Sequence, residues 1–359
     1  MHISRTIVAI TAILLGPTYL LVAQPASNTG PIAVLLAAGD ISYCNDTRAD
    51  ETARIIKHEI KAAREKDASV VIRVLALGDL AYKTGTAKQL ECFRGHWGDF
   101  YDILLPAPGN HEYESTNRDG KPYFDHFKKY GAKVPAGGKT MPLVVQNGEQ
   151  TGYYSVDLPS TKGAWRLISL NAYAGGTEPG KKGKEKRRKA MKAQMDWLNE
   201  QLDFSKDGNK QNCVLAFWHP PIFSSGKHGH GYDTDIDAPL EQENAMLWAL
   251  RKLYASGGSV VLAGHEHDYE QFSPHDADGN AAGDGIRTFV VGTGGAELTK
   301  DDYNHKAKNS EGIYGSTKGS RGVLRLELYE TRYEAQFVPV STNLASTFKK
   351  VEAPCSSRK

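Results

Sequence analysis

Five short polar motifs, each at the end of an apolar run, constrain this chain more than any other feature. The apolar runs are typical of buried strands, so the motifs are expected at strand ends, where sites in α/β sheets form. A glycine before the ligand lets the backbone turn sharply and approach an ion closely. The motifs are Gly39-Asp40, Gly78-Asp79-Leu80-Ala81-Tyr82, Gly109-Asn110-His111-Glu112, His219 and Gly264-His265-Glu266-His267.

The motifs supply more oxygen and nitrogen ligands than one metal ion needs. They suit two ions that share a carboxylate, and paired ions about 3.5–4 Å apart are a common device for displacement at phosphorus. The set therefore predicts a dinuclear site and favours phosphate-ester hydrolysis. The candidate ligands are Asp40, Asp79, Tyr82, Asn110, His219, His265 and His267.

The 359 residues allow one large domain or two ordinary ones, and we find no repeat or domain-sized linker. A net charge of +2 is too small to imply a nucleic-acid partner. Strand, helix and strand over residues 32–38, 51–66 and 70–77 predict a crossover unit with parallel strands. Residues 322–329 and 332–340 alternate and predict a hairpin. We expect two mixed sheets packed together, with helices outside.

Other segments show helical spacing or polar composition. Residues 191–202 and 241–254 are predicted to be helices, and residues 120–148 a surface excursion. The basic run over residues 181–189 is interpreted as a solvated loop before the first of these helices. The alternative is a basic surface that attracts anionic substrates or an anionic cell surface.

The N-terminus is typical of an exported protein. A basic end precedes apolar residues 7–23, and small residues follow at Ala23 and Ala26. We expect a signal peptide over residues 1–26, with an uncleaved anchor as the alternative. The expected product is secreted or periplasmic, has one domain over residues 27–359 and keeps no stable membrane span. Its oligomeric state is left open.

Export makes the four cysteines eligible for disulfide bonds. They allow three pairings, and sequence alone does not decide between these. Cys44 lies just after the first motif and Cys92 just after the second, so a bond between them would join two loops that converge on one site. We favour Cys44–Cys92, and Cys213–Cys355 with it.

The ordered motif set resembles the calcineurin-like metallophosphoesterases, and within them the purple acid phosphatases. The resemblance spans residues 32–340 and implies a four-layer α/β/β/α sandwich of two mixed sheets, in a short single-domain form. Most of that superfamily carries Asp-x-His in the first motif, whereas this chain has Asp40-Ile41-Ser42. Tyr82 matches the tyrosine that binds iron in purple acid phosphatases, and this match identifies the branch.

The resemblance also implies which ligands hold which ion, with Asp79 bridging the two. The first ion would be Fe(III), because a phenolate is a hard anionic ligand. The second would be a divalent ion such as Zn, Fe or Mn, among which ligand type does not choose. The Fe(III) site would comprise Asp40, Asp79, Tyr82 and His267, and the divalent site Asp79, Asn110, His219 and His265.

Two further histidines are expected to act on the substrate. His111 directly follows Asn110, and the resemblance implies that it contacts the phosphate together with Asn110. His228 lies nine residues after His219 and matches a family histidine that faces the substrate. His230 is a neighbouring competitor for that role.

The implied protein is a secreted di-metal phosphatase that hydrolyses small phosphomonoesters by attack of a metal-bound hydroxide. One alternative is a phosphodiesterase or nucleotidase on the same fold. A second, from another class, is a non-catalytic metal- or anion-binding surface protein that has kept the fold.

Overall fold

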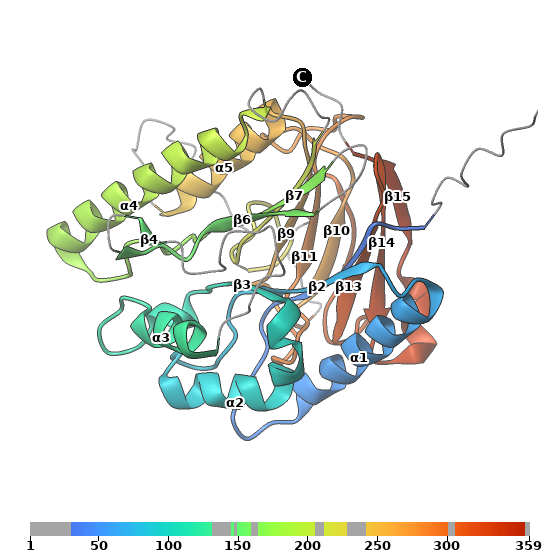
Figure 1. The fold of residues 1–359 in the computed structure, drawn as a ribbon, viewed down its shortest axis with the longest axis horizontal. Helices are drawn as coiled ribbons and strands as arrows, with labels where there is room; N and C mark the ends of the chain where they lie inside the picture. The colour runs from blue at the N-terminus through green and yellow to red at the C-terminus, as the bar shows by residue number, and fades with distance from the viewer. Residues whose placement is uncertain are drawn as a thin grey trace, which may run out of the picture. The chain divides into compact units, whose positions relative to one another are not determined.

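The apolar runs that precede the motifs form strands of two β-sheets that lie face to face (Figure 1). The computed structural model describes residues 30–130, 145–146, 149–158, 164–204, 212–227, 242–300 and 306–355. All of the elements named below belong to the unit Pro31–Lys359.

The first sheet is mixed, with the order β15-β14-β13-β1-β2-β3. β1 pairs in parallel with β2 and antiparallel with β13, so the predicted crossover unit is confirmed. β13 and β14 form the predicted hairpin. The strands are β1 (Ala33–Ala38), β2 (Val71–Leu77), β3 (Leu104–Ala107), β13 (Gly322–Leu328), β14 (Arg332–Pro339) and β15 (Val351–Pro354).

The second sheet is also mixed, with the order β12-β10-β11-β9-β8-β7-β6. β7, β8, β9 and β11 run parallel to one another at its centre. Its strands are β6 (Tyr154–Leu158), β7 (Ala164–Ser169), β8 (Asn212–Phe217), β9 (Gly258–Ala263), β10 (Tyr269–Phe272), β11 (Arg287–Val291) and β12 (Ser310–Tyr314). A separate two-stranded ribbon consists of β4 (Val145–Gln146) and β5 (Glu149–Gln150).

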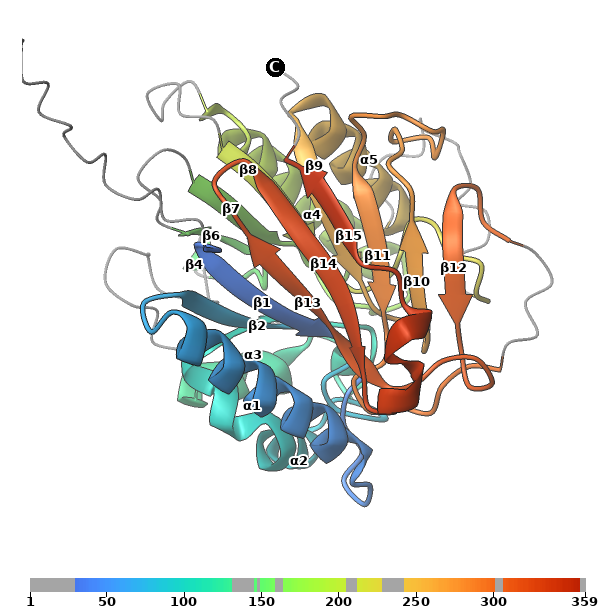
Figure 2. The same cartoon turned by 90° about the vertical axis from the view of Figure 1, so that its right-hand side faces the viewer.

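Helices cover the outer faces of both sheets, which confirms the predicted four-layer sandwich (Figures 1 and 2). Three lie against the first sheet: α1 (Arg48–Lys66), α2 (Ala87–Trp97) and α3 (Lys121–Tyr130). Two lie against the second: α4 (Gly180–Gln201) and α5 (Gln242–Ala255). Three short 3-10 turns complete the description: η1 (Gly98–Ile103), η2 (His111–Tyr113) and η4 (Thr342–Thr347).

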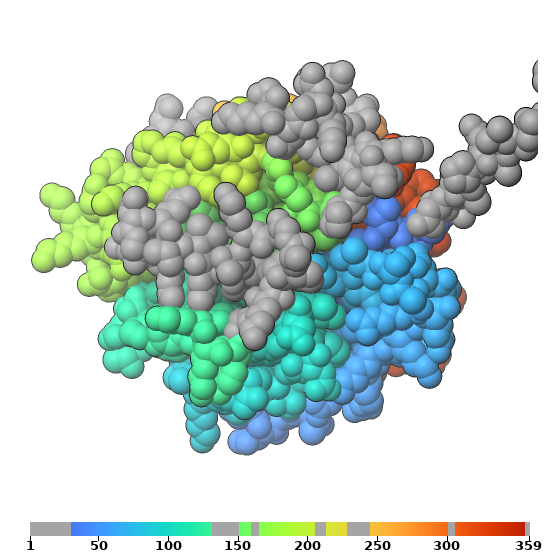
Figure 3. Space-filling view, in the orientation of Figure 1, coloured from blue at the N-terminus to red at the C-terminus, as the bar shows by residue number. Residues whose placement is uncertain are grey.

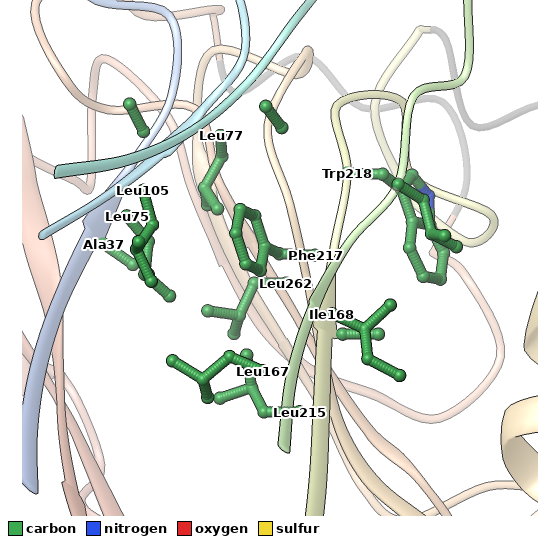
Figure 4. Packing of buried hydrophobic residues seen from close by; sticks show 14 of the residues in the cluster. Ala37, Leu75, Leu77, Leu105, Leu167, Ile168, Leu215, Phe217, Trp218 and Leu262 are labelled. Carbon is green, nitrogen blue, oxygen red and sulfur yellow. The ribbon is translucent and has the colours of Figure 1, made fainter. Parts of the chain in front are cut away.

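The main core lies between the two sheets (Figure 4). Leu75 and Leu105 project from the first sheet towards Leu215 and Phe217 of the second, and all four side chains are buried. Side chains alternate across each strand, so neighbouring residues of β7 and β8 pack on the opposite face, beneath the helices. Burial on both faces explains why these strands read as continuous apolar runs.

Two disulfide bonds join separate parts of this fold, and both favoured pairings are confirmed. Cys44 in the loop after β1 is bonded to Cys92, with their Cα atoms 5.1 Å apart. Cys92 lies within α2 rather than in a loop. Cys213 of β8 is bonded to Cys355, which follows β15, with their Cα atoms 5.6 Å apart. The second bond therefore connects the two sheets covalently.

Two loop predictions were wrong. The basic run is not a loop but the first turns of α4, which lie on the surface (Figure 3). Lysine and arginine are good helix formers, so charge alone does not argue against a helix. Part of the expected surface excursion is α3, whose Tyr123, Phe124 and Phe127 are buried. α1 begins three residues before the predicted range 51–66, and the side chain of Thr47, which precedes the helix, makes no capping hydrogen bond.

Candidate metal centre

The loops that carry the candidate ligands have unusual backbone geometry. Asp40, Asp79 and His265 have φ values of 61°, 49° and 73°. Residues other than glycine rarely adopt this left-handed region, and such positions cluster at functional sites. A Cβ atom on Gly109 would lie 2.1 Å from Oδ1 of Asp79, and one on Gly78 would lie 2.4 Å from Nδ1 of His219. Only glycine permits this packing, as the sequence predicted.

Three candidate ligands surround the hydroxyl group of a fourth, Tyr82. This hydroxyl lies 2.8 Å from Oδ1 of Asp40, 3.2 Å from Oδ2 of Asp79 and 2.9 Å from Nε2 of His267. Tyr82 is only 3% exposed, and its ring stacks on that of Tyr43 with 4.6 Å between centroids. These four residues are the set expected to hold the ferric ion.

A second group of candidate ligands also contacts Asp79. Nε2 of His219 is 3.2 Å from Oδ2 of Asp79 and 3.2 Å from Nδ1 of His265. One ligand atom from each of Asp79, His219 and His265 lies within 4.8 Å of the others, an arrangement that could hold a metal ion. Asp79 thus contacts both groups, which is the position that a bridging carboxylate needs.

Asn110 is the remaining candidate ligand of the second group. The backbone N–H of the next residue, His111, donates to Oδ1 of Asp79 at 2.9 Å, so the loop is tied to the centre. The side-chain oxygen of Asn110 is buried, and no donor in the described part of the chain reaches it. A buried acceptor without a partner is costly unless something else satisfies it. A cation at this position would do so.

Backbone carbonyls orient two of the histidines. Nδ1 of His219 donates to the carbonyl of Leu77, and Nδ1 of His267 to the carbonyl of Glu297, each at 2.8 Å. Because Nδ1 carries the hydrogen in this arrangement, Nε2 is left to face the centre. Metal-binding histidines are commonly held in this way.

Neighbouring charges and burial shift the pKa values of several candidate ligands. Burial lowers the pKa of His219 and His267, but the charges of Asp40 and Asp79 outweigh burial and raise both values to about 9. Burial favours the neutral form of Asp79, but the charge of His219 lowers the pKa of this carboxyl. Burial and both carboxylates raise the pKa of Tyr82. Metal binding must therefore displace protons from these ligands.

The donor set fits two ions. It combines carboxylate, phenol and amide oxygens with imidazole nitrogens, all of which bind first-row transition metals. All seven candidate ligands belong to the described residues and lie around Asp79. The loops that carry them come from both sheets.

Of the two histidines expected to contact the substrate, His111 belongs to the described residues. His111 lies at the edge of the centre, with Nε2 3.6 Å from Oδ2 of Asp79. Its Nδ1 contacts the carbonyl of Lys83 and Oε2 of Glu114. His228 and its competitor His230 lie outside the described residues, so their predicted role stays a prediction.

Buried glutamates that support the centre were missed by sequence reasoning. Glu112 belongs to a quoted motif but was given no role. It accepts from the backbone N–H groups of Leu80 at 2.9 Å, Ala81 at 3.2 Å and Gly109 at 2.7 Å, so it ties the second and third motif loops together. Burial, with the charge of Asp79, raises the pKa of Glu112 to about 7.

Glu270 is the corresponding support for the loop after His219. It accepts from the Ser225 backbone at 2.8 Å, the Ser225 hydroxyl at 2.5 Å and the Ser224 hydroxyl at 3.1 Å. Burial raises the pKa of Glu270. A glutamate three residues after the candidate ligand His267, in the buried strand β10, was the available sequence signal.

Comparison with known proteins identifies the family of this chain. A sequence model described as "Calcineurin-like phosphoesterase" matches residues 33–269. The chain therefore belongs to the calcineurin-like phosphoesterase family. Purple acid phosphatase 21 of Arabidopsis thaliana is 28% identical over 173 residues, which are 47% of this chain and 31% of that protein. This relative supports the purple acid phosphatase branch that Tyr82 indicates.

Solved structures share the fold. The purple acid phosphatase PPD1 from yellow lupin superposes with a TM-score of 0.57 at 17% identity, over 91% of this chain and 54% of that one. GAP50 of Plasmodium, described as an anchor in the inner membrane complex, superposes with a TM-score of 0.60 at 14% identity, over 91% and 90% of the two chains. At these identities the likeness concerns the fold alone. The chain spans 31–42% of the length of the curated relatives it matches.

Proposed function

We propose that this chain is a secreted di-metal hydrolase of phosphomonoesters. The observation that carries the proposal is the convergence of two ligand groups on Asp79, one around the hydroxyl of Tyr82 and one around His219. Asp40, Asp79, Tyr82 and His267 would hold Fe(III). Asp79, Asn110, His219 and His265 would hold a divalent ion such as Zn, Fe or Mn. When bound, the ions would neutralise phosphate oxygens and lower the pKa of the attacking water.

The chain's own residues would position the substrate and move the leaving-group proton. His111 presents Nε2 on the side of Asp79 and would hold a phosphate oxygen there. His228, by its offset from His219, would approach the same ester. Either imidazole could pass a proton to the departing alkoxide, a contribution of about 10²–10⁴-fold.

Secretion is part of the proposal. Two disulfide bonds are typical of proteins that fold in oxidising compartments. The N-terminal segment carries the features of a signal peptide. None of the described helices is long and apolar enough to cross a membrane.

A panel of substrates tests the proposal. The metal-loaded protein should hydrolyse an aryl and an alkyl phosphomonoester with higher kcat/KM than the matching bis-esters, from acid to neutral pH. D79N should lose activity on all of them, because both ligand groups depend on Asp79. Faster cleavage of the bis-esters would favour the phosphodiesterase alternative. No cleavage of any ester by protein that binds both ions would favour the non-catalytic alternative, which the anchor description of GAP50 keeps open.

Removal of His228 separates its two suggested roles. If His228 protonates the leaving group, H228A should lose far more activity on an alkyl phosphate than on a nitrophenyl phosphate, since nitrophenolate leaves without help. If it only grips phosphate, the two losses should be equal. Unchanged activity on both substrates would remove His228 from the site and direct the same test to H230A.

A further inference from the structure

Glu114 touches two residues of the candidate centre without belonging to any motif. It lies at the end of η2, and its side chain is 43% exposed. Its Oε1 accepts from Nδ2 of Asn110 at 3.2 Å, and its Oε2 lies 2.9 Å from Nδ1 of His111. We propose that Glu114 is a positioning residue that makes Asn110 present its oxygen, and His111 its Nε2, to the centre. This inference rests on the proposed function, because it assigns a ligand role to Asn110.

The orientation of the Asn110 amide matters because its oxygen and its NH₂ group have similar shapes but opposite roles. The oxygen can bind a cation, whereas the NH₂ group can only donate hydrogen bonds. Donation from Nδ2 to Glu114 turns Oδ1 away from Glu114. That oxygen is buried, and no donor among the described residues reaches it. Glu114 therefore accounts for which end of the amide is left for an ion.

His111 is held by the same carboxylate and by one backbone group. Nδ1 faces two acceptors, the carbonyl of Lys83 and Oε2 of Glu114, so it carries the hydrogen. Nε2 is then directed towards Asp79. Since Lys83 supports this arrangement independently, loss of Glu114 should disturb Asn110 more than His111.

A carboxylate suits this position because it can accept from both neighbours at once. A glutamine of the same size can accept from only one of them and presents an NH₂ group to the other. In E114Q, the glutamine NH₂ meets either the Asn110 amide or the Nδ1 hydrogen of His111. The first conflict is relieved when the Asn110 amide turns over, which places its NH₂ group at the centre.

Metal binding tests the proposal without reference to activity. Calorimetric titration of metal-free protein with Zn²⁺ should give a weaker second ion in E114Q and E114A, by about 10–100-fold, the usual effect of residues that orient ligands. The first ion should be retained. E91Q is the matched control: Glu91 is 41% exposed and pairs with Arg94 at 2.7 Å, as a surface residue of α2. It should bind both ions as the wild type does.

A double variant distinguishes orientation from a general structural role. In E114Q/N110D, the aspartate offers an oxygen whichever way it turns, and the glutamine NH₂ can donate to it. The second ion should then bind more tightly than in E114Q alone, whereas N110D alone sets two carboxylates side by side. Wild-type affinity for both ions in E114Q and E114A, or no rescue in the double variant, would overturn the proposal.

The same titrations separate this inference from the proposed function. Wild-type protein that binds two ions but cleaves no ester would contradict the function and leave the role of Glu114 intact. Protein that cleaves esters and is unaffected by E114Q and E114A would contradict the role of Glu114 alone.

Discussion

The hydroxyl oxygen of Tyr82 lies 2.9 Å from Nε2 of His267, although 185 residues separate them in the chain. Tyr82 follows β2 of the first sheet, and His267 follows β9 of the second. The candidate centre therefore exists only when the two sheets are packed together. This dependence links metal binding directly to the integrity of the fold.

Tyr82 should give the metal-loaded protein its colour. A ferric phenolate produces a charge-transfer band in the visible range, so Y82F should lose this band and keep the fold, since only one buried hydroxyl is removed. Absorption and circular dichroism spectra check both points. Y43F is the control, because Tyr43 stacks on Tyr82 and its ring is kept. An iron-loaded wild type without a visible band would contradict the assignment of Tyr82.

Glu112 should be important for stability as well as for the site. E112A would leave the buried N–H groups of Leu80, Ala81 and Gly109 without their acceptor, at a total cost of about 3–5 kcal/mol in the free energy of unfolding. E112Q keeps the volume and one acceptor oxygen, so its loss should be smaller. Denaturant unfolding measures both. Equal stability of E112A and the wild type would show that the two loops do not depend on this carboxylate.

His126 should make the protein less stable in acid. Burial lowers the pKa of His126 from 6.5 to about 4, an effect that Glu91 opposes and that Arg94 and Lys129 reinforce. Its Nε2 lies 2.6 Å from the hydroxyl of Tyr101, which donates to the neutral ring. Between these two pKa values the unfolded chain binds the proton more tightly. Stability is therefore full above pH 6.5 and falls by about 3 kcal/mol as the pH drops towards 4.

The measurement is the free energy of unfolding of metal-free protein across that pH range. H126Q should show a shallower loss than the wild type, because the titrating ring is gone. H58Q should follow the wild type, since the side chain of His58 is 78% exposed. A wild-type slope in H126Q would mean that His126 titrates equally in the folded and unfolded chain.

Sequence patterns predicted the parts of this fold that depend on local chemistry. Buried strands such as β1 read as continuous apolar runs, and the glycines before Asp79 and Asn110 indicated where the backbone comes close. α2 could have been predicted, because Thr86 and Gln89 form a capping box and Leu90, Phe93 and Trp97 recur at helical spacing. The expectation that Cys92 lies in a loop was wrong for this reason, since Cys92 belongs to this helix.

Other features could not be predicted, because they depend on contacts between distant segments. Glu112 and Glu270 act through hydrogen bonds to loops up to 46 residues away, and their places beside the motifs do not reveal these partners. Glu114 looks like any exposed glutamate until the amide of Asn110 is seen beside it. The secondary structure of the basic run over residues 181–189 was also ambiguous, because lysine suits both a helix and a solvated loop.

Metal content measured together with hydrolysis tests the central claim most directly. We predict two ions per chain, one of them iron, and hydrolysis of a phosphomonoester that chelation abolishes and added iron with zinc or manganese restores. D79N, which removes the carboxylate shared by both ligand groups, should bind neither ion well. Full phosphomonoesterase activity in protein freed of metal, or wild-type protein that binds no ions under iron and zinc loading, would contradict the account.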